Sequence, residues 1–453
     1  MATTTLSRTT ATPTLATKWT CSAWYKFSEL PGGGGSDRWL FGEYTDSSNH
    51  SYLYLRNSSA IGWFEKASGS VVISKITNQF LNDVSGWYHI MVAVDTTDST
   101  AEDRFKLYIN GVRVADWGTS TNTYGSSSSP RLNTASKTFY IGTATGYSSG
   151  QSYDGLMSHF HFCDGTALAQ SVFGETDSTT GIWKIKTAPS FTPGNNGFTI
   201  LKDGNTITDQ SANSNNFTLA AGTLTKSEDC PSNVFATLNP LDNYYAVSTF
   251  ANGATSQTSN ATAYGWVPST LGMVSGKWYA ECKQTGFSGG SNYDLIGITG
   301  AQNNANTHYL GQVSYTAGYY AQGNVYNQSG SATSTYASYT TGDIIGVALD
   351  LDNSALYFSK NGSWQNSGDP TSGASKTGAL TITAVGSTEK GAYFFASGDY
   401  GNSVVVNNSW NFGNGYFGTT AVSSAGTNAS GIGIFEYDVP SGYKALCTKG
   451  LND

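Results

Sequence analysis

The stretch GWYHIMVAVDTTDSTAEDRFKLYINGVRVADW (residues 86–117) decides the fold of the first half of the chain. It contains a long apolar run, WYHIMVAVD, followed by two shorter runs that flank Asn110 and Gly111. An Asn-Gly dipeptide readily adopts the positive φ angles of a type I′ turn, which joins two antiparallel strands. We therefore expect a β-hairpin here, packed beside a buried strand.

Strand-like runs recur along the whole chain. They are short, rich in Val, Ile, Tyr, Phe, Trp and Thr, and separated by clusters of Gly, Asn, Asp and Ser at intervals of roughly 8–12 residues. A second Asn-Gly turn stands at residues 361–362, within GDIIGVALDLDNSALYFSKNGSW (342–364). No segment of comparable length has a helical apolar period, and 453 residues exceed one ordinary core. The sequence therefore predicts an all-β protein of two antiparallel, jelly-roll-type sandwiches.

Composition and charge disfavour several function classes. The net charge is −8, and no block of basic residues offers a site for nucleic acid. No run approaches the 18 apolar residues or so that insertion in a membrane requires, and the opening residues lack the apolar core of a secretory signal. The cysteines are widely spaced and form no CxxC pair, so we expect small buried hydrophobes and neither a metal nor another cofactor. They are Cys21, Cys163, Cys230, Cys282 and Cys447.

The first half of the chain resembles the laminin-G-like branch of the concanavalin A-like lectin/glucanase superfamily. The resemblance rests on the paired runs of residues 86–117, on TKWTCSAWYKF (17–27) and on YDGLMSHFHFCDGTAL (153–168). It implies a β-sandwich over residues 1–185. Residues 1–16 are polar and rich in threonine, so we expect them to form an anchoring arm that a partner orders.

The second half resembles a SPRY domain, which is itself a concanavalin A-like sandwich. The motif GDxxGVxxDxxxxxLxFxKNG carries this resemblance: Gly342 and Asp343 open it, Asp350 stands at a strand end, and Leu356 and Phe358 face one side. The resemblance implies a second sandwich over residues 243–453. Residues 186–242 lack sustained apolar patterning and are expected to form an extended linker.

The order of these pieces resembles structural proteins of tailed bacteriophages. That resemblance implies a virion surface protein, either a tail fibre or appendage or a capsid decoration subunit, made in the host bacterial cytoplasm. Its implied partners are other virion proteins, further copies of itself and host-surface carbohydrate. A surface rich in Tyr, Ser, Thr and Asn without an export signal fits a protein that is exposed when the host lyses. A bacterial surface adhesin module secreted without a leader remains an alternative.

A polysaccharide-degrading enzyme of glucanase ancestry is the other alternative. Such enzymes carry paired carboxylates on one strand. The nearest match is Glu175 and Asp177 in GETDSTTG (174–181), which lacks a second glutamate and is rich in turn-forming residues. We therefore expect no catalytic activity, and we expect this pair to lie on a solvent-exposed loop.

Two groups of residues raise the question of metal binding. His159 and His161 alternate with Phe160 and Phe162, which favours phenylalanines in the core and histidines facing solvent or a partner over a zinc site. The acids Asp343, Asp350 and Asp352 are too few for calcium and are expected to accept turn hydrogen bonds.

A tyrosine-rich segment, HYLGQVSYTAGYYAQGNVYNQSG (308–330), is the remaining candidate for a ligand site. Tyrosine offers a large amphipathic ring at low entropy cost, and such rings stack on sugar faces. We expect some of these rings to be exposed and others to point into the core. The candidates are Tyr309, Tyr315, Tyr319, Tyr320 and Tyr326.

Overall fold

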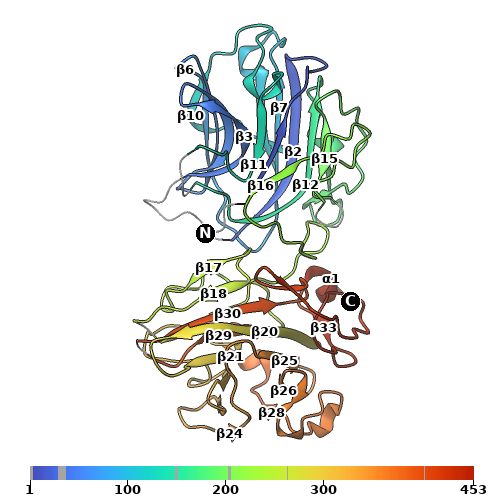
Figure 1. The fold of residues 1–453 in the computed structure, drawn as a ribbon. Coiled ribbons are helices and arrows are strands. Elements are labelled where there is room, and N and C mark those ends of the chain that lie inside the picture. The colour runs from blue at the N-terminus through green and yellow to red at the C-terminus, as the bar shows by residue number, and fades with distance from the viewer. Residues whose placement is uncertain are drawn as a thin grey trace. The chain divides into compact units, whose positions relative to one another are not determined.

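The computed structural model describes residues 4–28, 37–147, 151–202, 206–262, 264–401 and 403–452. The chain divides into two units, Met1–Lys226 and Ser227–Asp453, and each contains two large β-sheets (Figure 1). The all-β class predicted from the sequence is therefore confirmed. Within the described residues, no helix is long and apolar enough to cross a membrane.

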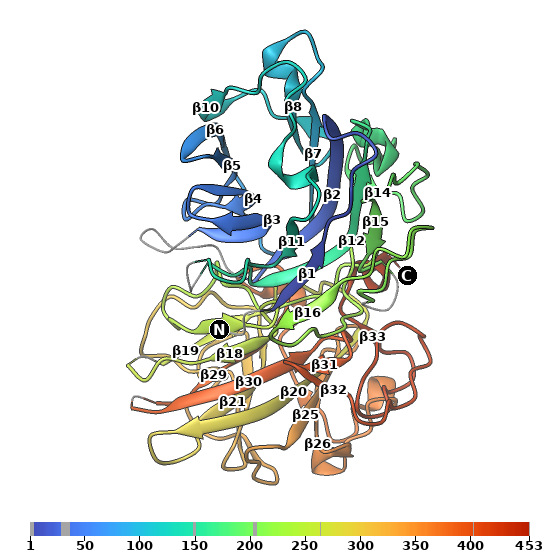
Figure 2. The ribbon, with the colours of Figure 1, turned by 45° about the horizontal axis from the view of Figure 1, so that its top comes forward.

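The first unit is a sandwich of two antiparallel sheets, which Figure 2 shows as separate layers. One sheet runs in the order β10 (Trp117–Asn122), β6 (Ser70–Phe80), β5 (Ala60–Ala67), β4 (Asn49–Leu55), β3 (Arg38–Asp46), β11 (Thr138–Ile141), β1 (Thr5–Thr9) and β16 (Thr218–Ala221). The other runs in the order β15 (Phe198–Ile200), β12 (Gly155–Asp164), β2 (Lys18–Phe27), β7 (Tyr88–Asp95), β8 (Phe105–Ile109) and β9 (Val112–Arg113). Smaller elements are the hairpin β13 (Gly174–Thr176) and β14 (Trp183–Ile185) and the 3-10 turns η1 (Ala101–Arg104), η2 (Arg131–Asn133) and η3 (Gln170–Val172).

Aromatic rings dominate the core between these two sheets. Trp19 of β2 meets Trp63 of β5 across the sandwich, with ring centroids 5.5 Å apart. Phe160 and Phe162 of β12 point into the core, as their alternation predicts, and both stack on Phe198. Rings of this size bury large apolar areas, which is the main favourable term in folding.

The segment expected to be an extended linker instead completes the first sandwich as far as residue 226. Phe198 and Ile200 of β15 pair with β12 and are fully buried, and Phe217 joins the same core. β16 then pairs with β1. These strands are only three or four residues long, so they show too little alternation to be recognised as strands in the sequence.

The described part of residues 1–16 forms part of the sandwich and not the expected anchoring arm. Residues 5–9 form β1, which lies between β11 and β16, and Leu6 packs in the core. Thr14 donates its backbone N–H to the buried Asp164 at 2.6 Å. Residues 1–3 of the arm lie outside the described residues. The sequence TLSRT contains one apolar residue, Leu6, and therefore shows no strand pattern. Pairing with a strand on each side orders this segment within the sandwich.

The second unit is also a two-sheet sandwich. One sheet runs in the order β17 (Thr249–Ala251), β18 (Ser256–Thr258), β30 (Val405–Asn411), β20 (Lys277–Ser288), β25 (Ile344–Asp350), β26 (Ala355–Lys360) and β27 (Ser363–Trp364), with β28 (Leu380–Thr381) on β26 and β33 (Lys444–Ala445) parallel to β20. The other runs in the order β19 (Gly265–Pro268), β29 (Phe394–Asp399), β21 (Asp294–Thr299), β22 (Thr316–Tyr320), β23 (Asn324–Asn327) and β24 (Ser334–Thr335). The remaining elements are the hairpin β31 (Tyr416–Phe417) and β32 (Thr420–Ala421), the turns η4 (Gln365–Ser367), η5 (Gly373–Ser375) and η6 (Val385–Ser387), and the helix α1 (Thr448–Asn452).

Both expected Asn-Gly hairpins are present. Asn110 and Gly111 have φ angles of 48° and 76° between β8 and β9, and Asn361 and Gly362 have 49° and 78° between β26 and β27. Positive φ at both central residues is the requirement of a type I′ turn. The turn chemistry therefore fixes the register of one hairpin in each sandwich.

Candidate functional site

The tyrosine-rich segment contributes to both faces of β22. Tyr319 points into the core of the second sandwich and donates its hydroxyl hydrogen to the carbonyl of Ala337. Tyr320 points to the opposite, outer face of the same sheet, where Tyr309 and Tyr326 also lie. Tyr315 belongs to neither group. We expected some of these rings to be exposed, but Tyr315 is half-buried and the other four are buried, whether they point into the core or to the outer face.

The three outer rings pack around Tyr400, which follows β29. The Tyr400 ring centroid lies 4.4 Å from that of Tyr309, 5.0 Å from that of Tyr320 and 5.6 Å from that of Tyr326. Tyr293 lies on the fourth side, at 5.9 Å. We call Tyr293, Tyr309, Tyr320, Tyr326 and Tyr400 the Tyr400 cluster. Burial raises the pKa of the Tyr309, Tyr320 and Tyr326 hydroxyls, so each stays a neutral donor at physiological pH.

The cluster has a buried base and a partly exposed rim. Tyr309, Tyr320 and Tyr326 are at most 6% exposed and rest on Trp266 and Leu295. Tyr293 and Tyr400 are partly exposed. A rigid base that supports accessible rings at its edge has the form expected of a binding surface, because little side-chain entropy is lost when a ligand stacks on it.

Tyr400 is not among the site residues predicted from the sequence, although alternation along β29 indicates the direction of its side chain. Phe395 and Ser397 face the core, where the Ser397 hydroxyl meets Trp410 and Gln257. Asp399 continues the inward set, so Tyr400 is expected to turn outward. The Tyr400 ring reaches the tyrosines of residues 309–326 because β29 pairs with β21. These two strands are far apart in the sequence, so local patterns do not reveal their pairing.

The carboxylate pair Glu175 and Asp177 lies on the exposed hairpin of β13 and β14. Lys184 bridges the two acids, at 3.3 Å from Glu175 and 3.4 Å from Asp177. Backbone N–H groups of Thr180 and Thr179 lower the pKa of Asp177 to about 2. A carboxyl that stays ionised at neutral pH does not serve as a general acid, and both acids are engaged by Lys184 on an exposed hairpin.

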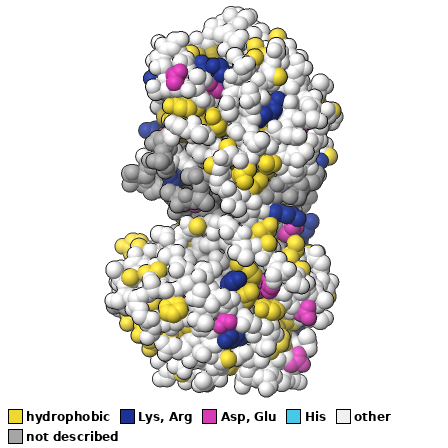
Figure 3. Space-filling model, viewed as in Figure 1, with side chains coloured by type: hydrophobic (Ala, Val, Ile, Leu, Met, Phe, Trp, Pro, Cys, Tyr) yellow, Lys and Arg dark blue, Asp and Glu magenta, His cyan; other side chains and the backbone are white. Residues whose placement is uncertain are grey.

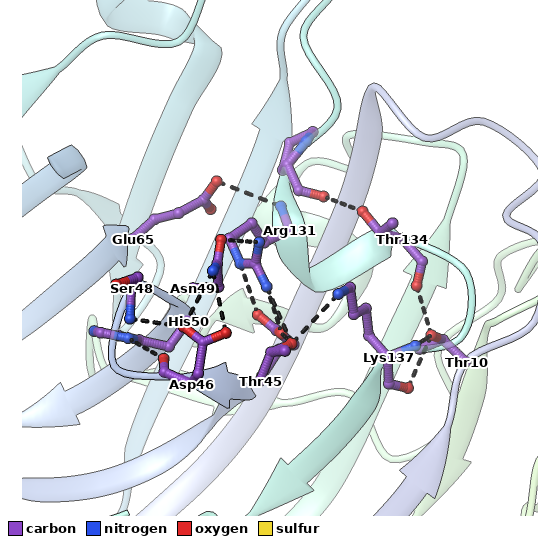
Figure 4. A network of polar contacts seen from close by, with 12 residues as sticks. Thr10, Thr45, Asp46, Ser48, Asn49, His50, Glu65, Arg131, Thr134 and Lys137 are labelled. Atoms are coloured by element: carbon purple, nitrogen blue, oxygen red, sulfur yellow. Dashed lines mark hydrogen bonds and ion pairs between the residues drawn. The ribbon is translucent and has the colours of Figure 1, made fainter. Parts of the chain in front are cut away.

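A second set of acids, absent from the residues predicted from the sequence, lies inside the first sandwich (Figure 4). Glu43 of β3 is clamped by the guanidinium of Arg131, with Nε at 3.0 Å and Nη2 at 2.7 Å from its two oxygens. Glu65 of β5 accepts the hydroxyl hydrogen of Tyr124 at 2.6 Å and the backbone N–H of Arg131 at 3.4 Å. Burial raises the pKa of Glu65 to about 7. These contacts anchor the turn η2 to the sheet, which is a structural role.

His159 and His161 do not face solvent, which corrects the sequence expectation. They are 6% and 3% exposed. His159 stands at an irregularity of β12 with a φ of 49°, and part of residues 166–191 folds back over the outer face of the sheet at His161. The His161 ring stacks on Phe173 with centroids 5.5 Å apart, and its Nδ1 lies 2.9 Å from the Thr199 hydroxyl. Burial lowers the pKa of His161 to about 3. Alternation along one strand cannot reveal a covering segment from elsewhere in the chain.

The acids considered for calcium serve turns and ion pairs. Asp343 accepts hydrogen bonds from Thr340 and Asn361, and Asp350 accepts two from Asn353 and pairs with Lys277 at 3.0 Å. Asp352 accepts the backbone N–H of Gly276. Across the described ranges, no group of three or more His, Cys, Asp and Glu side chains could hold a metal ion. The cysteines are free, and each except the half-buried Cys230 is buried.

Comparison with protein families finds one match within each of the two units. Residues 3–173 match the model of the concanavalin A-like lectin/glucanases superfamily. Residues 244–398 match the SPRY domain. The chain thus carries a concanavalin A-like domain followed by a SPRY domain. This is the order that the sequence predicts. The matched SPRY residues include every member of the Tyr400 cluster except Tyr400 itself, which lies two residues beyond them.

Several solved structures are similar to one domain of the chain at low identity. The SPRY domain of human HERC1 is 17% identical, and the match covers 36% of this chain and 91% of that one with a TM-score of 0.28. The native heptameric SAP-like pentraxin of Limulus polyphemus is 16% identical, covering 37% of this chain and 72% of the pentraxin chain with a TM-score of 0.28. No curated protein sequence matches the chain.

Proposed function

We propose that this chain is a non-enzymatic surface protein of a tailed-bacteriophage particle, which binds a partner through the outer face of its SPRY domain. The Tyr400 cluster carries this proposal. One face of an antiparallel sheet is commonly solvated and polar, whereas this one bears packed tyrosine rings. The partly exposed rings at its rim, Tyr293 and Tyr400, are of the residue type that is enriched at interaction sites.

The chemistry of the cluster favours a glycan of the host surface as the partner. Tyr293 and Tyr400 offer partly exposed rings for stacking on a sugar face. Charged side chains lie singly or in small groups on the face of the molecule in Figure 3. A surface with few charges favours stacking and hydrogen bonding over electrostatic capture. A neighbouring protein of the particle is the alternative partner.

The particle location is supported by the order of modules. A concanavalin A-like domain followed by a SPRY domain, with the intervening and terminal segments of this chain, resembles structural proteins of tailed phages. Within such a particle we propose that several copies of the chain assemble, as tail-fibre or decoration subunits do. The chain would then be exposed when the host cell lyses.

Binding of the wild-type chain to an array of bacterial cell-surface polysaccharides tests the assignment of the site. Tyr400→Ala should lose at least about tenfold in affinity for any polysaccharide that the wild type binds, because it removes the central ring. Tyr244→Ala is a matched control, since Tyr244 is 84% exposed and lies outside the cluster. Equal binding by Tyr400→Ala and the wild type would remove the Tyr400 cluster from the proposal.

A further inference from the structure

The outer face of one sheet in the concanavalin A-like domain is covered by a later segment of the same chain. Met91 and Ala93 of β7 point away from the sandwich core and are nonetheless buried, where they pack with Phe173. Phe173 belongs to residues 166–191, which include η3, β13 and β14 and which we call the strap. The strap is in the first unit of the chain, whereas the Tyr400 cluster is in the second.

The strap is tied down by hydrogen bonds at its two ends. The hydroxyl of Thr20 on β2 donates to the carbonyl of Thr166 at 2.9 Å and accepts the backbone N–H of Leu168 at 2.8 Å. Just past the other end, the Cys163 thiol donates to the carbonyl of Thr192 at 3.2 Å. Between these ends, β13 and β14 form a separate two-stranded sheet. Side-chain contacts therefore attach this hairpin to the domain.

Trp183 of β14 is the side chain that seats the hairpin. A Cβ atom on Gly111 would lie 2.4 Å from its ring, and one on Gly174 would lie 2.5 Å from it. The ring thus fits against the backbone at two positions where a larger residue would displace it. It also stacks on His89 of β7, with ring centroids 5.9 Å apart.

His89 accepts the hydrogen bond that holds Trp183 in this position. The indole Nε1 of Trp183 lies 3.1 Å from Nδ1 of His89. An indole N–H can only donate, so Nδ1 is unprotonated and the ring proton is on Nε2, 2.8 Å from the Ser22 hydroxyl. A proton added to Nδ1 would set two N–H groups against each other. Protonation of His89 therefore opposes the seated position of Trp183.

Two histidines are enclosed by aromatic rings beneath the strap. His89 lies between Trp183 and Trp24, whose ring centroid is 5.0 Å away. His161 contacts Phe173 and Phe191 of the strap, with centroids at 5.5 and 5.8 Å. Burial lowers the pKa of each imidazole to about 3. Opening of the strap would return both to water, where the pKa of a histidine is about 6.5.

The charged groups around these histidines do not favour protonation in the closed state. His159, His89 and Lys202 all lower the pKa of His161, and burial is the cause of the shift of His89. Lys26 adds a buried cation on β2, and burial raises the pKa of the Cys163 thiol to about 11, so it stays neutral. The acids of the strap and of the neighbouring segments are in ion pairs: Lys18–Asp95, Lys106–Asp98, Arg113–Asp103, and Lys184 with Glu175 and Asp177.

We propose that the strap is an acid-sensitive cover, which opens when His89 and His161 take up protons. The open strap binds more protons than the closed strap between about pH 3 and pH 6.5, so opening becomes more favourable as pH falls through this window. Above it the strap stays closed. Opening exposes Trp24, Met91 and Ala93, an apolar surface that the closed strap hides.

Hydrogen exchange of the full chain, read by mass spectrometry as protection factors, tests the proposal. Protection of the strap should fall at least about 100-fold between pH 7.5 and pH 4.5, because each histidine contributes up to about tenfold per pH unit below pH 6.5. Protection of β2 should not fall with it, since β2 pairs with β12 and β7 whether the strap is open or closed. Unchanged protection of the strap, or an equal fall in β2, would overturn the proposal.

His89→Gln removes one titrating group and should make the acid-induced fall at least about tenfold smaller. His50→Gln is the matched control, because His50 lies on β4 of the other sheet, and it should leave the fall in the strap unchanged. A fall of wild-type size in His89→Gln would overturn the proposal.

Trp183→Phe distinguishes titration of His89 from packing of the strap. It keeps an aromatic ring and removes the N–H that faces Nδ1, so His89 can take up a proton with less penalty while the strap is closed. Protection of the strap at pH 7.5 should fall about threefold or more through the lost hydrogen bond, and the further fall at pH 4.5 should be smaller than in the wild type. Lower protection at pH 7.5 with an acid-induced fall of wild-type size would show that Trp183 only packs, and would overturn the proposal.

Discussion

Asp294 and Asp399 lie directly opposite each other on the neighbouring strands β21 and β29, and both side chains are buried inside the second sandwich. Opposite residues of an antiparallel pair have Cβ atoms about 4.5–5.5 Å apart. Asn408 donates to one oxygen of Asp294 at 2.6 Å. The other oxygen of Asp294 and one oxygen of Asp399 accept no hydrogen bond from the described residues. Two carboxyl groups so placed are unfavourable when both are ionised.

The first prediction concerns the pH dependence of this sandwich. Burial raises the pKa of both Asp294 and Asp399 to about 7, and the charge of Asp294 contributes to the shift of Asp399. The folded state therefore binds more protons than the unfolded state between about pH 4 and 7, so the free energy of unfolding falls as pH rises through this window. Hydrogen exchange of β21 and β29, expressed as protection factors at pH 5 and pH 8, measures the fall.

Asp399→Asn removes one of these titrating groups and should reduce the fall between pH 5 and pH 8 by on the order of 2 kcal/mol. Asp369→Asn is the control. Asp369 is exposed and its pKa is lowered by hydrogen bonds to Thr371, so its effect lies below this window. If the free energy of unfolding falls as much between pH 5 and pH 8 in Asp399→Asn as in the wild type, the pH dependence does not come from this pair of carboxyl groups.

The second prediction concerns the clamp of Arg131 on Glu43. Arg131→Met leaves Glu43, whose side chain is 1% exposed, buried without its cation. Removing one partner of a buried pair costs about 3–5 kcal/mol. Arg113→Met removes an ion pair to Asp103 whose members are both partly exposed, and should cost less than about 1 kcal/mol. Urea unfolding of the full-length variants measures the difference.

Adding Glu43→Gln to Arg131→Met should restore part of the lost stability, because the orphaned charge is removed. If Arg131→Met is no more destabilising than Arg113→Met, the clamp is not an anchor of η2.

The third prediction separates backbone strain from steric contact at Gly111. A Cβ atom on Gly111 would lie 2.4 Å from the Trp183 ring, whereas one on Gly69 would meet nothing within 4 Å. Both glycines have similar φ angles, 76° and 81°. Gly69→Ala should therefore show the cost of the φ angle alone, about 1 kcal/mol, and Gly111→Ala should cost about 1–3 kcal/mol more.

Thermal unfolding of the two variants and of Gly111→Ala/Trp183→Ala checks this prediction. The double variant should unfold at a higher temperature than the sum of its single changes implies, because the ring that the new methyl group meets is gone. If the two changes lower the unfolding temperature additively, contact with the Trp183 ring does not contribute to the cost of Gly111→Ala.

Local features of the sequence predicted the fold where the chemistry itself is local. Asn110-Gly111 and Asn361-Gly362 form their expected turns because few other dipeptides accept two positive φ angles. Phe160 and Phe162 face the core because strand side chains alternate. Leu356 and Phe358 of the SPRY motif face one side for the same reason, and both lie in the second core.

Features that depend on distant pairing were not predictable in the same way. β1 and β16 are separated by more than 200 residues in the chain, and Leu6 is the lone large apolar side chain in β1. The burial of His161 depends on a covering segment from elsewhere in the chain. Three members of the Tyr400 cluster were predicted as site residues because they stand close together in the sequence, whereas Tyr400 itself comes from another strand.

The most direct test of the account is to look for this polypeptide in purified phage particles. Particles from lysates of the bacterium that produces the chain would be banded on a density gradient, and their proteins quantified by mass spectrometry. The account predicts that the chain bands with the capsid or tail proteins at a fixed copy number and is accessible to an antibody on intact particles. A chain that stays with the free proteins of the lysate while the particles band without it would contradict the account.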